Sequence, residues 1–107
     1  MDLNGKVAIV TGGARGIAKG IATAFVKAGA SVLIVDREEE LGKETAAELG
    51  QYGKVAFMAM DLSQHDQLHL IVDRAVAEFG RLDTLVNAAQ ASAQKMFAQQ
   101  TREEANV

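Results

Sequence analysis

Short apolar runs alternate along this chain with segments in which apolar residues recur at helical spacing. The runs are residues 6–11, 31–36, 55–60 and 82–87, and the first two are rich in β-branched residues. A continuous apolar run is typical of a strand that is covered on both faces, as the strands of parallel sheets are. The alternation therefore predicts an α/β fold in which parallel strands are joined by right-handed helical crossovers, with helices on both faces of the sheet.

The intervening segments predict three helices, over residues 17–28, 38–49 and 64–79, the last with Ser63 as its N-cap. Their apolar faces are expected to pack on the sheet. In the first helix this face is predicted to be Ile17, Ile21, Phe25 and Ala28. In the third helix it is predicted to be Leu68, Ile71, Val72, Ala75, Val76 and Phe79. A glycine follows each helix, as is common at C-termini: Gly29, Gly50 and Gly80.

Composition excludes several classes of protein. The 107 residues suffice for one hydrophobic core, so residues 1–107 are expected to form a single domain. The net charge of −3 argues against a nucleic-acid-binding protein, which would usually carry a basic patch. Because the chain has no cysteine, disulfides, thiolate catalysis and thiolate zinc sites are excluded. No apolar run is long enough for a membrane span or a secretory signal, so we expect an intracellular, cytoplasmic protein.

A glycine-rich segment connects the first predicted strand to the first predicted helix. Gly12, Gly13 and Gly16 would permit a tight turn and a close approach of the backbone to a phosphate at the helix N-terminus. Asp36 ends the second predicted strand, 20 residues beyond Gly16. The alternative is a glycine turn that only reverses the chain. The full combination is typical of a Rossmann-like, three-layer dinucleotide-binding fold, for which we expect the strand order 3-2-1-4 and a crevice between the first and fourth strands.

The choice between NAD and NADP depends on the charges around the adenine ribose. Asp36 would accept hydrogen bonds from the ribose hydroxyls and would repel a 2′-phosphate, which favours NAD. Arg15 and Arg37 act in the opposite direction, since either guanidinium could pair with that phosphate, although both could equally be solvated surface charges. We expect the carboxylate to dominate, so NAD is the predicted cofactor and NADP the less favoured one.

Segments along most of the chain resemble motifs of the short-chain dehydrogenase/reductase family. Residues 11–18 (TGGARGIA) are similar to the family's T-G-x-x-x-G-I-G loop, and residues 87–90 (NAAQ) to its N-N-A-G segment. Asp36 matches the family's acidic residue at the second strand, and Asp61 matches its aspartate beside the adenine. The resemblance implies that these residues bind the cofactor: Gly12, Arg15, Gly16, Ile17, Asp36, Arg37, Asp61, Leu62, Asn87, Ala88 and Ala89.

Three positions depart from these motifs. Ala18 replaces the last glycine of the loop and adds one methyl group, which we expect the packing of helix against strand to tolerate. Ala88 replaces the second asparagine, so the hydrogen bonds of that side chain are lost. Gln90 replaces a glycine beside the expected position of the nicotinamide. The last two changes are expected to weaken cofactor binding.

The resemblance also implies an activity for the parent protein, the oxidation or reduction of an alcohol/carbonyl pair with a nicotinamide dinucleotide. Members of the family use a serine, a tyrosine and a lysine, the last two in a Y-x-x-x-K segment. The chain has one tyrosine, Tyr52, which lacks that pattern and is expected in a loop away from the active site. We therefore expect a truncated chain that carries the cofactor-binding part, lacks catalytic residues and is inactive alone.

Functions of other classes stay open at this point. The chain could be a non-catalytic nucleotide-binding or oligomerising module, in which the edge of a truncated sheet pairs with a partner; a homo-oligomer is expected. A methyltransferase of Rossmann-like fold would share Asp36 but not the glycine spacing.

Individual residues also have alternative interpretations. Asp61 could be a turn residue at a strand end, and Asn87 a structural residue of its loop. His65 and His69 have a spacing that can chelate a metal ion, but a solvated helix face is the simpler interpretation, so no metal site is predicted.

Overall fold

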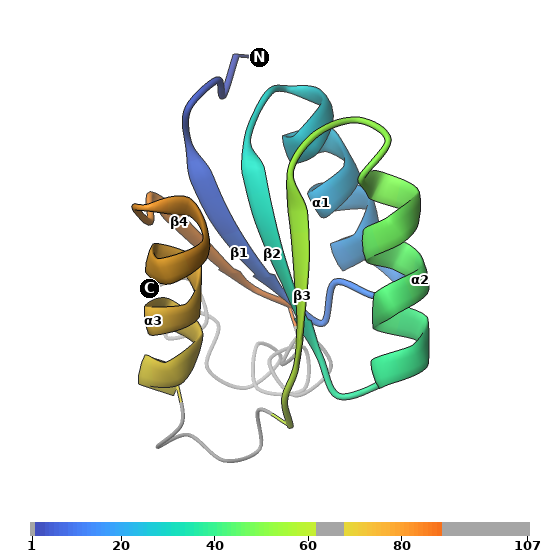
Figure 1. Ribbon diagram of the computed structural model, residues 1–107. Coiled ribbons are helices and arrows are strands. Elements are labelled where there is room, and N and C mark those ends of the chain that lie inside the picture. Colours follow the sequence, from blue (N-terminus) through green and yellow to red (C-terminus); the bar gives the residue numbers. More distant parts are fainter. Residues whose placement is uncertain (1, 62–67, 89–107) are drawn as a thin grey trace, which may run out of the picture.

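The computed structural model describes residues 2–61 and 68–88 of the chain. Strands and helices alternate within them, as the sequence pattern predicts (Figure 1). The elements in chain order are β1 (Val7–Thr11), α1 (Gly16–Lys27), β2 (Ser31–Asp36), α2 (Glu39–Leu49), β3 (Val55–Ala59), α3 (Leu68–Phe79) and β4 (Thr84–Asn87). None of these helices has the length and apolar character needed to cross a membrane.

The four strands form one parallel sheet in the order β3-β2-β1-β4. Helices α1 and α2 lie on one face of the sheet and α3 lies on the other (Figure 1). The predicted α/β class, strand order and covering of both faces are therefore confirmed. In the register of the sheet, Thr11 at the end of β1 lies opposite both Val35 of β2 and Asn87 of β4. The carboxyl ends of three strands thus meet at one edge, where the glycine segment follows.

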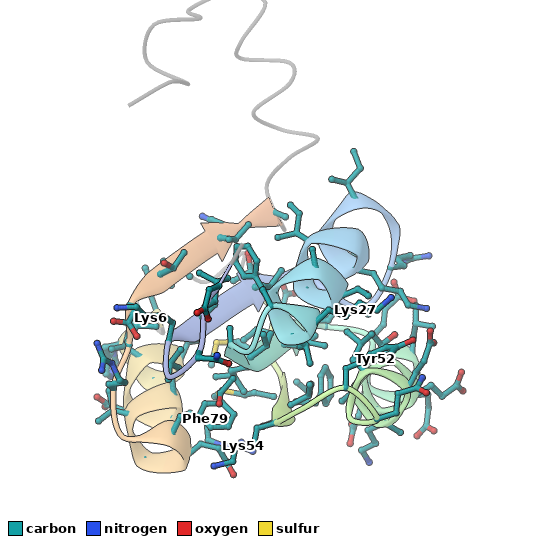
Figure 2. All side chains as sticks on the ribbon, turned by 90° about the horizontal axis from the view of Figure 1, so that it is seen from above. Lys6, Lys27, Tyr52, Lys54 and Phe79 are labelled. Carbon is teal, nitrogen blue, oxygen red and sulfur yellow. The ribbon has the colours of Figure 1, made fainter. Side chains whose placement is uncertain are left out.

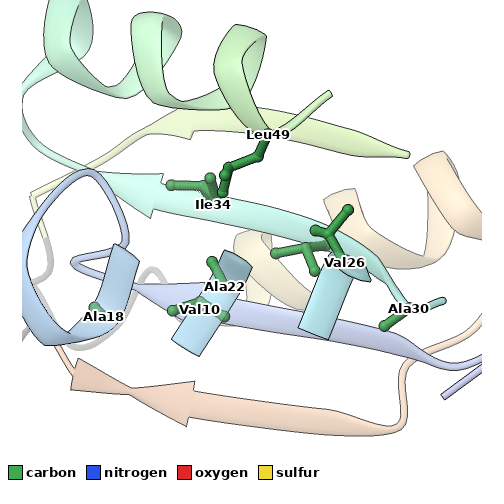
Figure 3. Packing of buried hydrophobic residues seen from close by; sticks show 8 residues of the cluster. Val10, Ala18, Ala22, Val26, Ala30, Ile34 and Leu49 are labelled. Carbon is green, nitrogen blue, oxygen red and sulfur yellow. The ribbon is translucent and has the colours of Figure 1, made fainter. Parts of the chain in front are cut away.

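The core consists of two clusters, one on each face of the sheet. All of β1 and nearly all of β2 are buried, as expected for strands covered on both sides. The cluster beneath α1 and α2, part of which is drawn in Figure 3, consists of Val10, Ala18, Ala22, Val26, Ala30, Val32, Ile34 and Leu49. The cluster beneath α3 consists of Ile9, Leu33, Val35, Ile71 and Ala75.

The predicted apolar face of α1 is wrong by one residue. The helix buries Ala18, Ala22 and Val26, whereas the predicted face begins at Ile17, which is 84% exposed. Ile21, Phe25 and Ala28 are only partly buried. The periodicity favoured the larger side chains, but two alanines on the inner face let the helix backbone approach the sheet closely.

Smaller differences concern α3 and the ends of elements. Leu68 and Val76, predicted on the inner face of α3, are 41% and 45% exposed. The predicted strands start one or two residues early at β1 and β4, and the third extends one residue too far. Gly29 and Gly80 have positive φ after their helices, but Gly50 has φ −61°, so its place needs no glycine-specific conformation. The predicted N-cap Ser63 lies outside the described residues.

Thr45 connects α2 to the glycine segment after β1. Its hydroxyl donates to the carbonyl oxygen of Ala14 at 2.7 Å, and the side chain is buried. A hydroxyl on the inner face of a helix needs such a partner, because burying it without one costs free energy. The position of the glycine segment is therefore fixed partly by the second helix.

Asp83, which directly precedes β4, links this strand to β1 by hydrogen bonds. Its N–H donates to the carbonyl oxygen of Val7 at 2.9 Å, and its Oδ2 accepts the N–H of Val7 at 2.8 Å. Its Oδ1 accepts a hydrogen bond from the Arg81 guanidinium at 2.7 Å. These bonds from Arg81 and Val7 lower the pKa of Asp83 below its ordinary value of 3.8.

Replacing Thr45 tests the contribution of its hydrogen bond. Thr45→Val keeps the size of the side chain but removes the donor, so we expect the free energy of unfolding to fall by about 1–2 kcal/mol. Thr23→Val is the matched control, because the Thr23 hydroxyl donates to Lys19 within its own helix and should matter less. Chemical denaturation of both variants measures the difference; equal losses would contradict the assignment.

The variant Asp83→Asn tests whether the hydrogen bonds of the Asp83 carboxylate stabilise the fold, because their contribution should depend on pH. Because the pKa of Asp83 is lowered in the folded state, its ionised form stabilises the fold above the ordinary pKa, and this stability is lost as pH falls through the folded-state pKa. The difference in unfolding free energy between the wild type and Asp83→Asn should therefore shrink from about pH 5 to about pH 3 in urea titrations. The exposed Asp73→Asn serves as control. If the difference in unfolding free energy does not change with pH, the stabilising role of the Asp83 carboxylate is refuted.

Candidate functional site

The three glycines between β1 and α1 are required for two different reasons. Gly12 and Gly16 have φ values of 70° and 67°, in the left-handed region that residues with a side chain rarely adopt. At Gly13, a Cβ would come within 3.0 Å of the Ile34 side chain and 3.1 Å of the Val10 carbonyl oxygen. Apart from its chain neighbours and the backbone of its own helix, no described atom lies within 4 Å of a Cβ built at Gly16. The loop is therefore tight on its inner side and open on its outer side.

The N-terminus of α1 follows this loop without a cap. Its N-cap residue, Arg15, makes no side-chain hydrogen bond to the helix, and the first turn contains no acidic residue. The first N–H groups of a helix have no partner within the helix, and the macrodipole places partial positive charge beside them. Ile17, in the same turn, is a large apolar side chain left 84% exposed. An uncapped end with these features suits an anion such as a phosphate.

Asp36 links the loop to the second helix. It is 9% exposed; its Oδ2 accepts the N–H of Ala14 at 3.2 Å, and its Oδ1 accepts the N–H of Glu38 at 2.9 Å. Two loop amides are thus used by the protein itself, that of Ala14 and that of Gly12, which donates to the carbonyl oxygen of Val35 at 2.6 Å. A carboxylate has about four acceptor positions, so two hydrogen bonds leave capacity for two more. The carboxylate therefore fits the predicted ribose-binding role, while it also holds the loop.

The two arginines predicted near the ribose have different surroundings. Arg15 forms an ion pair with Glu38, the N-cap residue of α2. Arg37 is exposed, and no ion pair of its side chain is found within the described part of the chain. Sequence reasoning missed Glu38, as well as Thr45. The polar Thr45 between Gly42 and Leu49 on one helix face was a signal; Glu38 offered only its place two residues after Asp36.

The end of β4 adds a further polar side chain to the same edge of the sheet. Asn87 accepts a hydrogen bond at its Oδ1 from the hydroxyl of Thr11 at 2.9 Å, so its side chain links β4 to β1. Ala88 is partly buried against the core cluster beneath α1. Asp61 is exposed and follows β3 closely. Leu62 and Ala89, also predicted to bind the cofactor, lie outside the described residues, as does Gln90.

Tyr52 and the histidine pair are the two other candidates from the sequence. Tyr52 precedes β3 at the opposite end of the sheet, as predicted, and the Lys27 ammonium lies 4.7 Å from the centre of its ring (Figure 2). His69 is exposed on α3, and His65 is outside the described residues. Among the residues described, no cluster of three or more His, Cys, Asp or Glu side chains is placed to hold a metal ion.

Comparisons with known proteins agree with this geometry. The sequence model of the short chain dehydrogenase family matches residues 6–106. Tropinone reductase-like 2 of Erythroxylum coca is 45% identical over 87 residues, which are 81% of this chain and 31% of the relative. The chain thus spans about a third of the length of such relatives.

Solved structures of similar fold include dehydrogenases of the same family. A 7α-hydroxysteroid dehydrogenase, complexed with NADH and 7-oxo glycochenodeoxycholic acid, has a TM-score of 0.77 and 36% identity over 80% of this chain and 34% of that one. The RhlG/NADP active-site complex of Pseudomonas aeruginosa has a TM-score of 0.71 and 40% identity over 80% of this chain and 35% of that one. With a family match over almost its whole length and the parallel sheet in the expected order, this chain belongs to the short-chain dehydrogenase family.

Proposed function

We propose that this chain is the cofactor-binding part of an oxidoreductase that uses a nicotinamide dinucleotide on an alcohol/carbonyl pair. The observation that carries the proposal is the pairing of an uncapped helix N-terminus with a buried carboxylate at the next strand end. The open side of Gly16 gives a phosphate access to the α1 amides, and Asp36 stands at the position for the ribose. Both groups lie at the carboxyl edge of the sheet, where ligands of such folds bind.

Each group of predicted binding residues would contact a different part of the dinucleotide. The amides at the start of α1 would bind the pyrophosphate, with the Ile17 side chain beside it. Asp36 would accept hydrogen bonds from the adenine ribose, and Asp61 would lie by the adenine. Asn87 and Ala88, at the end of β4, would face the nicotinamide half. The bound cofactor would supply or accept the hydride.

The charges at the ribose favour NAD over NADP. Asp36 is a buried carboxylate directed at the loop, and it would repel a 2′-phosphate. Arg15, which could attract that phosphate, is already paired with Glu38. The similar structures include one complexed with NADH and one with NADP, so the preference is drawn from this chain's own residues.

The chemical step is proposed to depend on residues outside this stretch of 107. Its single tyrosine, Tyr52, lies at the end of the sheet opposite the glycine loop, beside Lys27. A general acid or base must reach the reacting atoms within hydrogen-bond distance. The chain alone would then bind the cofactor without turning over a substrate.

Thermal unfolding with and without NAD tests the cofactor proposal. At ten times its Kd, a bound ligand adds about 1.4 kcal/mol, a rise in Tm of roughly 5–10 °C for a domain of this size. Ile17→Glu should abolish the rise, because its carboxylate would repel the pyrophosphate, while the exposed side chain and the helix N-terminus tolerate the charge. Ala77→Glu, at an exposed position on α3, should keep the rise. No rise in the wild type at millimolar NAD would refute the proposal.

A second candidate function, as an oligomerising module, is favoured by apolar side chains exposed on α3 and β4. In the described part of the chain β4 pairs only with β1, so its other edge is open. Four leucine or valine side chains on these two elements are 41–45% exposed: Leu68, Leu70, Val76 and Leu85. We propose that the open edge of β4, where Leu85 lies, is covered in a homo-oligomer.

Light scattering tests that assembly. We expect the wild type to be a dimer or larger at micromolar concentration, and Leu85→Lys, on the open strand, to shift it towards monomer. Ala77→Lys, an exposed position on α3 outside this group, should have a smaller effect. A monomeric wild type across the concentration range would exclude the second function.

A further inference from the structure

Glu38 makes two contacts that converge on the proposed ribose site. Its backbone N–H donates to Oδ1 of Asp36 at 2.9 Å, and its side chain forms an ion pair with Arg15. It joins the carboxylate that faces the ribose to the guanidinium that precedes α1. The side chains of Arg15 and Glu38 are 65% and 38% exposed, so a solute can reach the pair.

The pair determines how Arg15 can act on an incoming phosphate. A guanidinium binds phosphate best through parallel N–H donors, and a carboxylate on the same donors competes for them. While Glu38 holds Arg15, the cation is directed to α2 and its charge is neutralised locally. The negative charge of Asp36 would then act on a bound ribose without compensation by Arg15.

We infer that Glu38 is a specificity-determining residue, which excludes 2′-phosphorylated dinucleotides by holding Arg15 in an ion pair. The inference rests on the proposed cofactor site and extends it. It assigns the discrimination to three residues acting together, in which Asp36 repels the phosphate and Glu38 withholds the nearby cation from it. The discriminated group is the ribose 2′-phosphate.

A neighbouring ion pair on the same helix supplies a matched control. Glu39 pairs with Lys43 at 3.0 Å, one turn along α2, and both side chains are more than half exposed. Glu39→Gln removes one negative charge one residue away from Glu38, without touching Arg15 or Asp36. Any general effect of lowering the negative charge of α2 should appear in both variants.

The experiment compares the Kd values of NAD and NADP for the chain, measured by calorimetry. In Glu38→Gln, the ratio of Kd for NADP to Kd for NAD should fall about 3- to 10-fold, the effect of one freed surface cation. In Glu39→Gln it should change less than about twofold. The backbone N–H that Asp36 accepts is kept in Glu38→Gln, and circular dichroism melting verifies that this variant folds.

Arg15→Gln separates the ion-pair effect from a simple change of charge. In the wild-type background this change should alter the ratio less than about twofold, because Arg15 is engaged with Glu38. In the Glu38→Gln background it should reverse most of the gain in NADP binding. Equal effects of Arg15→Gln in the two backgrounds would show that only the sum of charges matters and would overturn the inference.

The remaining outcomes distinguish a failure of the role inferred for Glu38 from a failure of the proposed cofactor binding. If the wild type binds NAD but Glu38→Gln changes the ratio no more than Glu39→Gln, the role of Glu38 is refuted while the cofactor site stands. If the wild type binds neither dinucleotide, the proposed function fails and takes the inference with it.

Discussion

The geometry of the site depends on one residue, Ala14, whose backbone is held through both its N–H and its carbonyl oxygen. The N–H of Ala14 donates to the Asp36 carboxylate, and its carbonyl oxygen accepts the hydroxyl of Thr45. Both partners belong to the second strand and helix, so the conformation of the first loop is determined by residues more than twenty positions later. Because both hydrogen bonds are buried, water does not compete for them. With Ala14 fixed, Gly12 and Gly16 at positive φ carry the chain from β1 into α1.

The hydrogen bonds that the Asp36 carboxylate accepts from the backbone also orient it before any ligand binds. Asp36 loses little conformational freedom when a ligand arrives, because two backbone N–H groups hold it in place beforehand. The same contacts explain why a residue proposed to bind a ligand is so deeply buried. The structural role of Asp36 and its proposed binding role would thus coincide in one side chain.

Much of the fold could be predicted from the sequence, because its signals are local. The order of strands and helices and the parallel sheet follow from continuous apolar runs separated by amphipathic segments. The inner face of α1 could not be predicted, since Ala18 and Ala22 are weakly hydrophobic and are buried only because the helix lies close to the sheet. Such a choice depends on packing between elements, which periodicity does not contain.

The candidate site could be predicted in outline but not in its connections. The spacing of Gly16 and Asp36 located the loop and the carboxylate correctly. The partners Thr45 and Glu38 were missed, because a hydroxyl or a charge on a helix is usually a surface feature until the fold places it beside a loop. Arg15 shows the same limit: the sequence gives its charge, whereas the ion pair with Glu38 decides what that charge can attract.

The two halves of the proposed dinucleotide would contact strands that differ in burial. In the described residues, β1 and β2 each have a strand on both sides and are almost completely buried, whereas β4 is a half-exposed edge. Amides in such edges exchange with solvent through small local openings, while central strands exchange only when the whole domain unfolds. The adenosine half would therefore lie against buried central strands, and the nicotinamide half, at Asn87, against the more exposed strand of the described residues.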